Sequence, residues 1–240
     1  MGEEAALKVE ELRFGYDGAR VIRGLDLELA VGDVVCVIGP NGAGKTTTLR
    51  VIAGLERPEA GRILCRGERI DGHSPKEILK RGIGLVPQEA RLFRGMTVLE
   101  NLQMGAYLRN DAEGVGRDLA RVYLLFPVLK KRAGQRAGSL SGGERQMLAV
   151  ARSLMSRVKV LLMDEPSLGL APMLVAGLGR IILDINAETH LSVMLVEQNA
   201  EMALNVARYG YVLERGRIAM EGRTQDLLKS DKIRQAYLGL

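Results

Sequence analysis

The 240-residue sequence has few aromatic residues, two cysteines and no tryptophan. Aromatic side chains make up 4% of the chain, and this scarcity argues against a surface on which nucleic-acid bases stack. Cys36 and Cys65 lie in apolar, strand-like runs and do not have the spacing of zinc ligands. We therefore interpret them as buried thiols in a reducing compartment, and we expect no metal site from them.

Long apolar runs are also missing. No window approaches about 18 consecutive uncharged apolar residues, the length of a membrane-spanning helix. Residues 1–10 are acidic and mixed, unlike the basic and then apolar layout of a signal peptide. The chain is therefore expected to stay in the cytoplasm. Its length fits one large α/β domain, and a hydrophobic content of 47% suffices for a core.

Positive charge is concentrated in the middle of the chain. The formal net charge is +5, but residues 90–157 contain twelve Lys and Arg against five acidic residues, which makes this segment +7 and the remainder −2. Such an excess can meet nucleic acid or an anionic membrane face, and a solvated helix surface can carry it too. We favour proximity to a membrane.

Hydrophobic periodicity predicts a largely parallel sheet with a helical insertion. A buried strand is expected at residues 34–38, a short strand at 62–65, and further strands at 84–86, 158–163 and 192–196. Helices are expected at 45–53, from Ser74, at 143–155 and at 173–185. A strand at 7–14 and a strand pair around 21–29 predict a peripheral antiparallel part, and helical spacing after Thr97 predicts the insertion. A hairpin at 209–220 and short helices at 224–229 and 231–238 close the chain.

The most informative stretch is Gly39–Thr47, which follows the apolar run Val34–Ile38 and fits the P-loop pattern. Its glycines let the backbone wrap a phosphate chain, and a helix that opens at Lys45 adds its positive dipole end. Lys45 is predicted to reach the terminal phosphates, and the Thr46 hydroxyl to coordinate a bridging Mg²⁺. The expected nucleotide-binding residues are Gly39, Pro40, Asn41, Gly42, Ala43, Gly44, Lys45, Thr46 and Thr47.

Two acidic residues, Asp164 and Glu165, follow the strand expected at 158–163. Parallel strands deliver side chains at their carboxyl ends, where a P-loop also lies. Asp164 is predicted to hold Mg²⁺, directly or through water, and Glu165 to polarise the water that attacks the γ-phosphate. An isolated Asp-Glu pair more often decorates a helix N-terminus, but the apolar run and the P-loop favour the catalytic interpretation.

A second glycine-containing motif, Leu140–Gln146, reads Leu-Ser-Gly-Gly-Glu-Arg-Gln. It places a hydroxyl and two bare backbone N–H groups at a predicted helix start, which is another anion site. The simpler alternative is a Ser N-cap followed by two flexible glycines. Because the P-loop already provides one cradle, we expect Ser141, Gly142 and Gly143 to complete the nucleotide site of another subunit.

With these motifs the chain resembles the nucleotide-binding subunit of ATP-binding cassette (ABC) transporters over essentially all its residues. The resemblance implies one ABC ATPase domain over 1–240, with a helical subdomain at approximately 90–157, and ATP and Mg²⁺ as cofactors. It further implies that Tyr16 stacks on adenine, that Gln88 senses Mg²⁺ and the attacking water, and that Glu165 is the catalytic base. By sequence alone, Tyr16 could be a core or hairpin aromatic and Gln88 a surface amide.

Three strings are similar to one of the two ATPases of branched-chain amino acid importers: Met163–Pro172, Leu195–Ala200 and Ala236–Gly239. This resemblance implies transmembrane permease subunits, a second and non-identical ABC ATPase and, indirectly, an extracytoplasmic substrate-binding protein as partners. The chain would lie on the inner face of the cell membrane, and a homodimer can still form in isolation. Nucleic acid is not an expected partner.

Three positions depart from the broad family pattern. Leu170 stands where many members carry Asp, and Gln198 where most carry a switch His that neither His73 nor His190 replaces. Gln198 follows a predicted strand, so its amide is expected near the γ-phosphate, where it cannot gain or release a proton between about pH 5 and 8. A surface Gln without nucleotide contact is the alternative. Gln88 stands where many members of the subgroup carry an acid and related urea and amide importers carry Gln.

The rival functions differ mainly in their partners. A urea or amide importer, or a lipid or polysaccharide exporter, would use an ATPase of similar size. Non-transport ABC ATPases that act on ribosomes or DNA usually carry two cassettes or a long coiled-coil insertion, whereas this chain has one P-loop and no heptad run. A subunit that binds ATP without hydrolysis is disfavoured by Lys45, Asp164 and Glu165.

Overall fold

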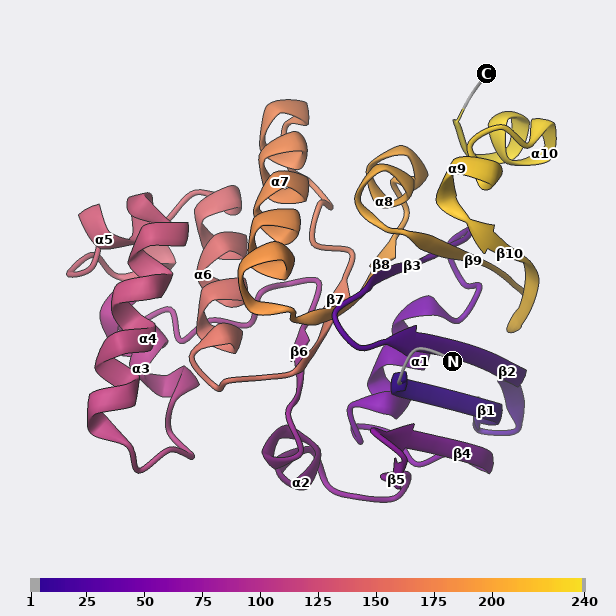
Figure 1. The fold of residues 1–240 in the computed structure, drawn as a ribbon, viewed down its shortest axis with the longest axis horizontal. Coiled ribbons are helices and arrows are strands. Elements are labelled where there is room, and N and C mark those ends of the chain that lie inside the picture. The colour runs from indigo at the N-terminus through magenta and orange to yellow at the C-terminus, as the bar shows by residue number, and fades with distance from the viewer. Residues whose placement is uncertain (1–4, 239–240) are drawn as a thin grey trace.

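The computed structural model describes residues 5–238, and Figure 1 shows two sheets, with α3 to α7 (within residues 98–189) gathered at the end of the molecule away from the smaller sheet. The smaller sheet is antiparallel, in the order β2-β1-β4-β5, with β1 (Ala5–Tyr16), β2 (Ala19–Ala30), β4 (Ala60–Cys65) and β5 (Glu68–Arg69). The larger sheet has the order β10-β9-β3-β8-β7-β6 and contains β3 (Val34–Ile38), β6 (Ile83–Val86), β7 (Val160–Asp164), β8 (Ser192–Glu197), β9 (Tyr209–Glu214) and β10 (Arg217–Arg223). Within this sheet the pairs are parallel except for β9 with β10.

The helices occupy the connections between these strands. They are α1 (Lys45–Ile52), α2 (Pro75–Lys80), α3 (Val98–Gly105), α4 (Ala112–Leu125), α5 (Pro127–Lys131), α6 (Gly142–Leu154), α7 (Pro172–Thr189), α8 (Ala200–Val206), α9 (Thr224–Leu227) and α10 (Asp231–Ile233). A 3₁₀ turn at Ala137–Ser139 and a π turn at Arg234–Leu238 complete the helical segments. Within residues 5–238, none of the helices combines the length and the apolar character that crossing a bilayer requires.

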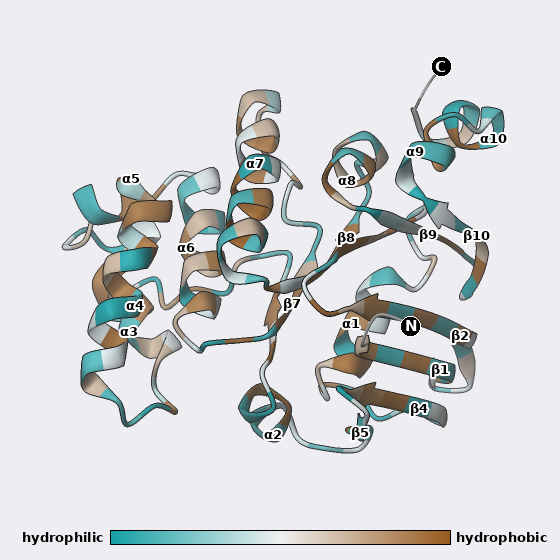
Figure 2. Ribbon diagram, in the orientation of Figure 1, coloured by the Kyte–Doolittle hydropathy of each residue, from teal (hydrophilic) through white to brown (hydrophobic). Residues whose placement is uncertain are grey.

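The two faces of the larger sheet bury different elements. Val35 and Val37 of β3 pack on the side of α1 and the antiparallel sheet, whereas Cys36 and Ile38 pack on the side of α6, α7 and α8. Every residue of β3, β7 and β8 is buried, as continuous apolar runs require when a parallel sheet is covered on both faces. The helices α4, α6 and α7 are accordingly banded in brown and teal in Figure 2, because only one face of each meets the core.

The helical insertion shares its core with the larger sheet. Leu102 of α3, Phe126 between α4 and α5, and Leu148 of α6 belong to one buried cluster. This cluster also contains Val86 and Leu161 of the sheet. Three helices begin with a capping box, in which a Ser or Thr side chain accepts the N–H of a Glu three residues later and that Glu accepts the first residue's N–H. These pairs are Ser74 with Glu77, Thr97 with Glu100 and Ser141 with Glu144.

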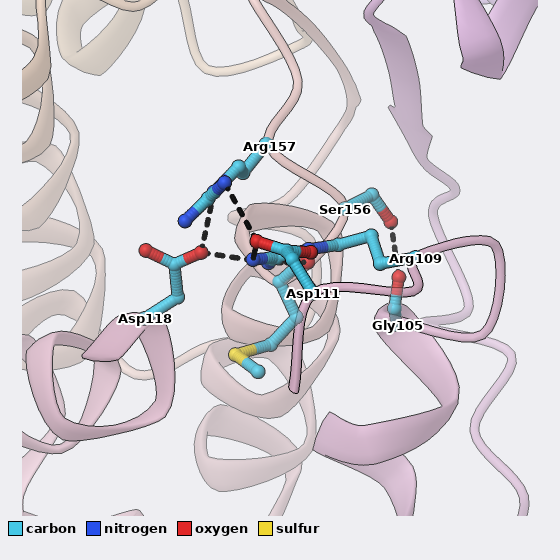
Figure 3. Close-up of polar contacts among 7 residues, drawn as sticks. Gly105, Arg109, Asp111, Asp118, Ser156 and Arg157 are labelled. Carbon is cyan, nitrogen blue, oxygen red and sulfur yellow. Dashed lines mark hydrogen bonds and ion pairs between the residues drawn. The ribbon is translucent and has the colours of Figure 1, made fainter. Parts of the chain in front are cut away.

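Four charged side chains tie the α3–α4 connection to the segment after α6 (Figure 3). Arg109 bonds Asp111 at 2.9 Å and Asp118 at 2.6 Å, and Arg157 bonds the same two carboxylates at 2.9 and 2.7 Å. The hydrogen bond from Arg109, supported by the charges of both guanidiniums, lowers the pKa of Asp111 to about 2. Part of the positive charge in residues 90–157 is therefore neutralised locally.

Most predicted elements are confirmed, and the differences have local causes. The expected strand pair around 21–29 is wrong, because β2 is one strand in which Gly24, with φ 84°, is a bulge between the pairs Leu12–Leu25 and Arg13–Arg23. The helix α8 was not expected; Asn199 begins it by accepting the Met202 N–H at 3.0 Å. The expectation of buried thiols is confirmed. In the C-terminal string, Gly239 lies outside the described residues.

Candidate nucleotide-binding site

The P-loop, residues 39–47, connects β3 to α1 and depends on close approaches that only glycine allows. A Cβ atom on Gly39 would collide with the carbonyl oxygen of Leu213 at the end of β9. Gly44 has φ 106°, a conformation that other residues rarely adopt, and it immediately precedes α1. The turn between β9 and β10 supports the loop, since the Gly216 N–H donates to the Ala43 carbonyl at 2.9 Å. Pro40, Asn41 and Gly42 remain exposed.

Lys45 is buried, with 4% of its surface exposed, and its hydrogen bonds and ion pair join the P-loop to Glu165. Its Nζ donates to the carbonyl oxygens of Gly39 at 2.9 Å and Pro40 at 3.3 Å. The same Nζ lies 3.2 Å from Oε1 of Glu165, which is also buried. One ammonium group thus joins the P-loop backbone to the carboxylate that follows β7.

Thr46 and Asp164 form the neighbouring contact, in which the Thr46 hydroxyl donates to Oδ1 of Asp164 at 2.9 Å. Burial raises the pKa of the Asp164 carboxyl above its ordinary value, the hydrogen bond from Thr46 acts in the opposite direction, and the charge of Glu165 adds to the rise. Lys45 pairs with Glu165 rather than with Asp164. The Asp164 carboxylate is therefore placed where a cation would relieve its unfavourable charge.

Glu165, which follows β7, is bonded to residues at or after the ends of other strands. Its backbone is left-handed, with φ 43°, and its N–H donates to the Val196 carbonyl of β8 at 2.8 Å. Gln88, which follows β6, donates from Nε2 to the second carboxylate oxygen, Oε2, at 3.1 Å. The carboxyl ends of β3, β6 and β7 thus bring Lys45, Gln88 and Glu165 together, as parallel strands do at one edge of a sheet.

The structure adds two polar residues that the sequence pattern did not single out. Glu197, the last residue of β8, is 1% exposed and accepts two hydrogen bonds from Ser167, one from its N–H at 2.9 Å and one from its hydroxyl at 2.7 Å. Burial raises the pKa of Glu197, although the hydrogen bonds from Ser167 and Asn199 act in the opposite direction. A charged residue at the end of an apolar strand could have indicated Glu197 in the sequence. Its partner Ser167 is thirty residues away, so the sequence did not indicate their contact.

Ser141, Gly142 and Gly143 are not brought to the P-loop. Ser141 caps its own helix, with its hydroxyl accepting the Glu144 N–H at 3.3 Å, and Gly143 faces Leu174 of α7. The helix α6 packs on the face of the larger sheet opposite to α1. Within residues 5–238, no hydrogen bond or ion pair joins this helix start to residues 39–47 or to Glu165.

Tyr16 and Gln198 lie outside the hydrogen-bonded centre. Tyr16 is 41% exposed, with its ring edge-to-face on Phe14 and its hydroxyl donating to Glu56 at 3.3 Å. It is therefore not a core aromatic. Gln198 is exposed and lines the same groove of about 830 Å³ as Glu165 and Ser167. Its side chain makes no hydrogen bond within the described part of the chain.

Comparisons with known proteins agree with this geometry. The family model described as ABC transporter matches residues 22–168. The chain belongs to the ABC transporter family. It is 42% identical over 233 residues to the high-affinity branched-chain amino acid transport ATP-binding protein BraG of Pseudomonas aeruginosa, covering 97% of this chain and 99% of that protein. It is 33% identical over 239 residues to the lipopolysaccharide export system ATP-binding protein LptB of Escherichia coli K12, covering 98% of each.

The fold is that of an ABC cassette. A crystal structure of the ADP conformation of an ATP-binding cassette of an ABC transporter superposes with a TM-score of 0.87 at 27% identity, covering 98% of this chain and 99% of that one. The predicted fold class and family are confirmed. As an ABC cassette, the chain binds ATP.

The metal that accompanies ATP in such sites can be tested against the donors of this cassette. The Thr46 hydroxyl and the Asp164 carboxylate offer adjacent oxygen atoms, 2.9 Å apart, and hard oxygen donors are what Mg²⁺ prefers. The raised pKa of Asp164 indicates a carboxylate that a cation would stabilise. These two residues fit Mg²⁺. Gln88, the third predicted ligand, donates its side-chain hydrogen bond to Glu165 and not to Thr46 or Asp164.

Proposed function

We propose that this chain is the ATP-hydrolysing subunit of an ABC importer for branched-chain or related amino acids, bound to permease subunits at the inner face of the cell membrane. The observation that carries hydrolysis is the convergence of Lys45, Gln88 and Glu165, with bonds of 3.2 and 3.1 Å to the same carboxylate. Identity to BraG exceeds identity to LptB, 42% against 33%, and this difference favours import over export.

The proposed organisation is one ATP-binding domain, with a helical subdomain at approximately residues 90–157. The core that Leu102, Phe126 and Leu148 share with Val86 and Leu161 supports a single unit. In the proposed dimer, Ser141–Gly143 meets the nucleotide held by the other ATPase, which we propose to be non-identical. This shared arrangement is supported by the packing of α6 and α1 on different faces of the larger sheet, because the α6 start then does not bond the P-loop of its own chain.

In the proposed reaction each side chain exchanges one partner for another. Lys45 releases the carbonyl oxygens of Gly39 and Pro40 and bonds the terminal phosphates of ATP. Glu165, then free of Lys45, accepts the proton of the attacking water, which Gln88 helps to orient. Thr46 and Asp164 would hold Mg²⁺, whose charge would neutralise the phosphate oxygens.

Gln198 is proposed to orient the γ-phosphate or the attacking water from its place after β8. An amide can donate and accept a hydrogen bond but does not exchange protons near neutral pH. The base role therefore falls on Glu165 alone. The adenine contact is proposed for Tyr16, whose exposed ring at the end of β1 is available for stacking.

Permease docking is proposed at a groove of about 370 Å³ between the helical insertion and the sheet. Three exposed apolar side chains line it: Leu55, Phe93 and Tyr107, with 44%, 45% and 59% exposure. Arg152 stands over the Phe93 ring at 5.7 Å and adds positive charge. Phe93 is five residues after Gln88, and Gln88 bonds Glu165. A partner that binds Phe93 would therefore be able to shift Gln88 and, with it, the contact to Glu165.

Purification of the full chain with its native permeases tests this proposal. We expect one copy of this chain, a second ATPase, and ATP hydrolysis that a branched-chain amino acid and its binding protein stimulate. Recovery of export permeases, or stimulation by lipid or polysaccharide instead, would support the exporter alternative. Micromolar binding of duplex DNA or mixed RNA at physiological salt, with stimulated hydrolysis, would contradict the transport function.

The docking groove is tested with Tyr107→Glu, which should reduce recovery with the permeases while leaving ATP binding unchanged. Leu124→Ala is the matched control, because Leu124 is 81% exposed on α4 and does not line the groove. Equal recovery of the two variants with the permeases would contradict docking at this groove.

A further inference from the structure

A buried carboxylate at the edge of the site takes no part in the proposed reaction. Glu197 is 1% exposed, and both of its oxygens are occupied by donors from two different loops. Oε1 accepts the Ser167 N–H at 2.9 Å, and Oε2 accepts the Ser167 hydroxyl at 2.7 Å and the Asn199 N–H at 3.4 Å. A buried carboxylate is tolerated only where such donors replace water, so this arrangement requires a specific geometry of both loops.

The first of these loops carries Glu165. Its turn is left-handed at Glu165, with φ 43°, and the Leu168 N–H closes it by donating to the Glu165 carbonyl at 3.1 Å. One side of the turn is held by the backbone bond from Glu165 to Val196, and the other by the two bonds from Ser167 to Glu197. Because Val196 and Glu197 are consecutive, the end of β8 holds both sides of the turn that presents the proposed base.

The second loop carries Gln198. This residue lies between Glu197 and Asn199, and the N–H of Asn199 donates to the Glu197 side chain. Asn199 is also held on its other side, since its Oδ1 caps α8 by accepting the Met202 N–H at 3.0 Å. The backbone on both sides of Gln198 is therefore fixed, while its own side chain remains exposed in the groove that Glu165 lines.

We infer that Glu197 is a positioning residue for ATP hydrolysis, which fixes Glu165 relative to Gln198 by joining the loop after β7 to the loop after β8 through Ser167 and Asn199. This inference rests on the proposed function, because it assigns Glu197 an effect on the step that Glu165 and Gln198 perform. Neither Glu197 nor Ser167 contacts the P-loop in a hydrogen bond, so the effect belongs to turnover and not to nucleotide affinity.

The experiment measures kcat, KM and the dissociation constant for ATP in the full chain, starting with the wild type. Ser167→Ala removes the 2.7 Å bond and keeps the backbone donor. We expect kcat to fall about tenfold, within the range that small misplacements of reacting groups produce. The dissociation constant for ATP should stay within about twofold, since Lys45 and the P-loop are unchanged. Glu197→Gln should lower kcat less than Glu197→Ala, because an amide retains one acceptor oxygen.

A double-mutant cycle separates positioning from simple loss of stability. If Ser167 acts through Glu197, the fold-change caused by Ser167→Ala should be smaller in the Glu197→Gln background than in the wild type. Ser192→Ala is the matched control, because it removes another buried hydroxyl, which accepts the Gly32 N–H at 2.9 Å at the opposite end of β8. It should lower the Tm as Ser167→Ala does and leave kcat unchanged.

The outcomes distinguish this inference from the proposed function. A wild-type chain that does not hydrolyse ATP, alone or with its permeases, would overturn the proposed function. A folded Ser167→Ala variant with wild-type kcat would overturn the role of Glu197 while hydrolysis stands. Equal losses of kcat in Ser167→Ala and Ser192→Ala would also overturn it, because the effect would then follow stability. Ser167→Ala serves as the test even where Glu197→Ala fails to fold.

Discussion

The helix starts of α1 and α6 are both built from glycine and hydroxyl residues, and they differ in what their polar groups contact. At α1, Lys45 bonds the loop after β3 and Glu165 after β7, and Thr46 bonds Asp164, the last residue of β7, so the start is joined to a network within the same chain. At α6, Ser141 bonds Glu144 of its own helix, and its glycines face Arg145 or Leu174. The start of α1 is bonded to the proposed catalytic residues, whereas the Ser141 side chain at the α6 start bonds within α6 itself.

The difference follows from the two faces of the sheet. The helix α1 begins after the P-loop that follows β3, and its Thr46 bonds Asp164 at the end of β7, whereas α6 packs on the opposite face of the sheet with α3 and α7. The two helices therefore pack on different faces of the larger sheet. We therefore expect variants at the two starts to affect hydrolysis in different ways.

Glu165→Gln should have the largest effect on the α1 side. Loss of a positioned base lowers turnover by about a hundredfold or more. ATP binding should persist, because Lys45 and the P-loop remain, and a dimer should accumulate in ATP and Mg²⁺. Steady-state hydrolysis with size analysis measures both effects. Wild-type turnover in this variant would remove Glu165 from the role of base.

Gly142→Asp addresses the α6 side with little change in the isolated chain. A Cβ at Gly142 would have no neighbour nearer than the Arg145 side chain at 4.0 Å, and an acidic residue suits the first turn of a helix. In a dimer the added carboxylate would face the phosphates of the other subunit. We expect an unchanged Tm and hydrolysis lowered by more than about tenfold, with Gly142→Ala as the uncharged control.

Mixing two defective chains sharpens the same comparison. A Lys45→Ala chain retains its α6 start, and a Gly142→Asp chain retains its P-loop. If sites are shared, a mixture should regain hydrolysis that neither variant shows alone. A mixture no more active than the sum of its parts, under conditions where the wild-type chain dimerises and hydrolyses ATP, would contradict sharing.

Gln198→Ala should have a smaller effect than either change above. We expect hydrolysis about tenfold slower with little loss of ATP binding, the effect of losing one hydrogen bond to a charged group. Gln198→His should preserve activity and introduce a pH dependence near neutrality, because imidazole titrates there. Wild-type hydrolysis by Gln198→Ala in the assembled transporter would leave Gln198 as a surface residue.

Asp111→Asn should have the smallest effect, on the attachment of the α3–α4 connection to the segment after α6 (Figure 3). The folded pKa of Asp111 is about 2, below its unfolded value. Its contribution to stability is therefore present above about pH 4 and is lost as the pH falls through about 2. We expect a slightly lower Tm than wild type at neutral pH, and a difference that shrinks as the pH falls through about 2. Glu113→Gln, at a more exposed ion pair, is the control.

How far the sequence predicted the site depended on whether the signal was local. The run Val34–Ile38 and the glycines that follow it predicted the strand, the turn and the start of α1, because backbone conformation and burial act on neighbouring residues. The pair Asp164 and Glu165 could be placed because parallel strands end at one edge. The strand pair expected around residues 21–29 was wrong, because the glycine in that run, Gly24, is a bulge within one strand and not a turn between two.

The sequence by itself identified this chain as an ABC cassette and predicted that residues 39–47 bind phosphate. Only the tertiary structure decided that Lys45 bonds Glu165, that Glu197 holds Ser167, and that the Gly216 turn supports Ala43. These contacts join residues far apart in the chain, and their geometry depends on how the strands align and how the core packs. Periodicity reports which face of an element is buried, but it contains no information on which distant residue will lie against it.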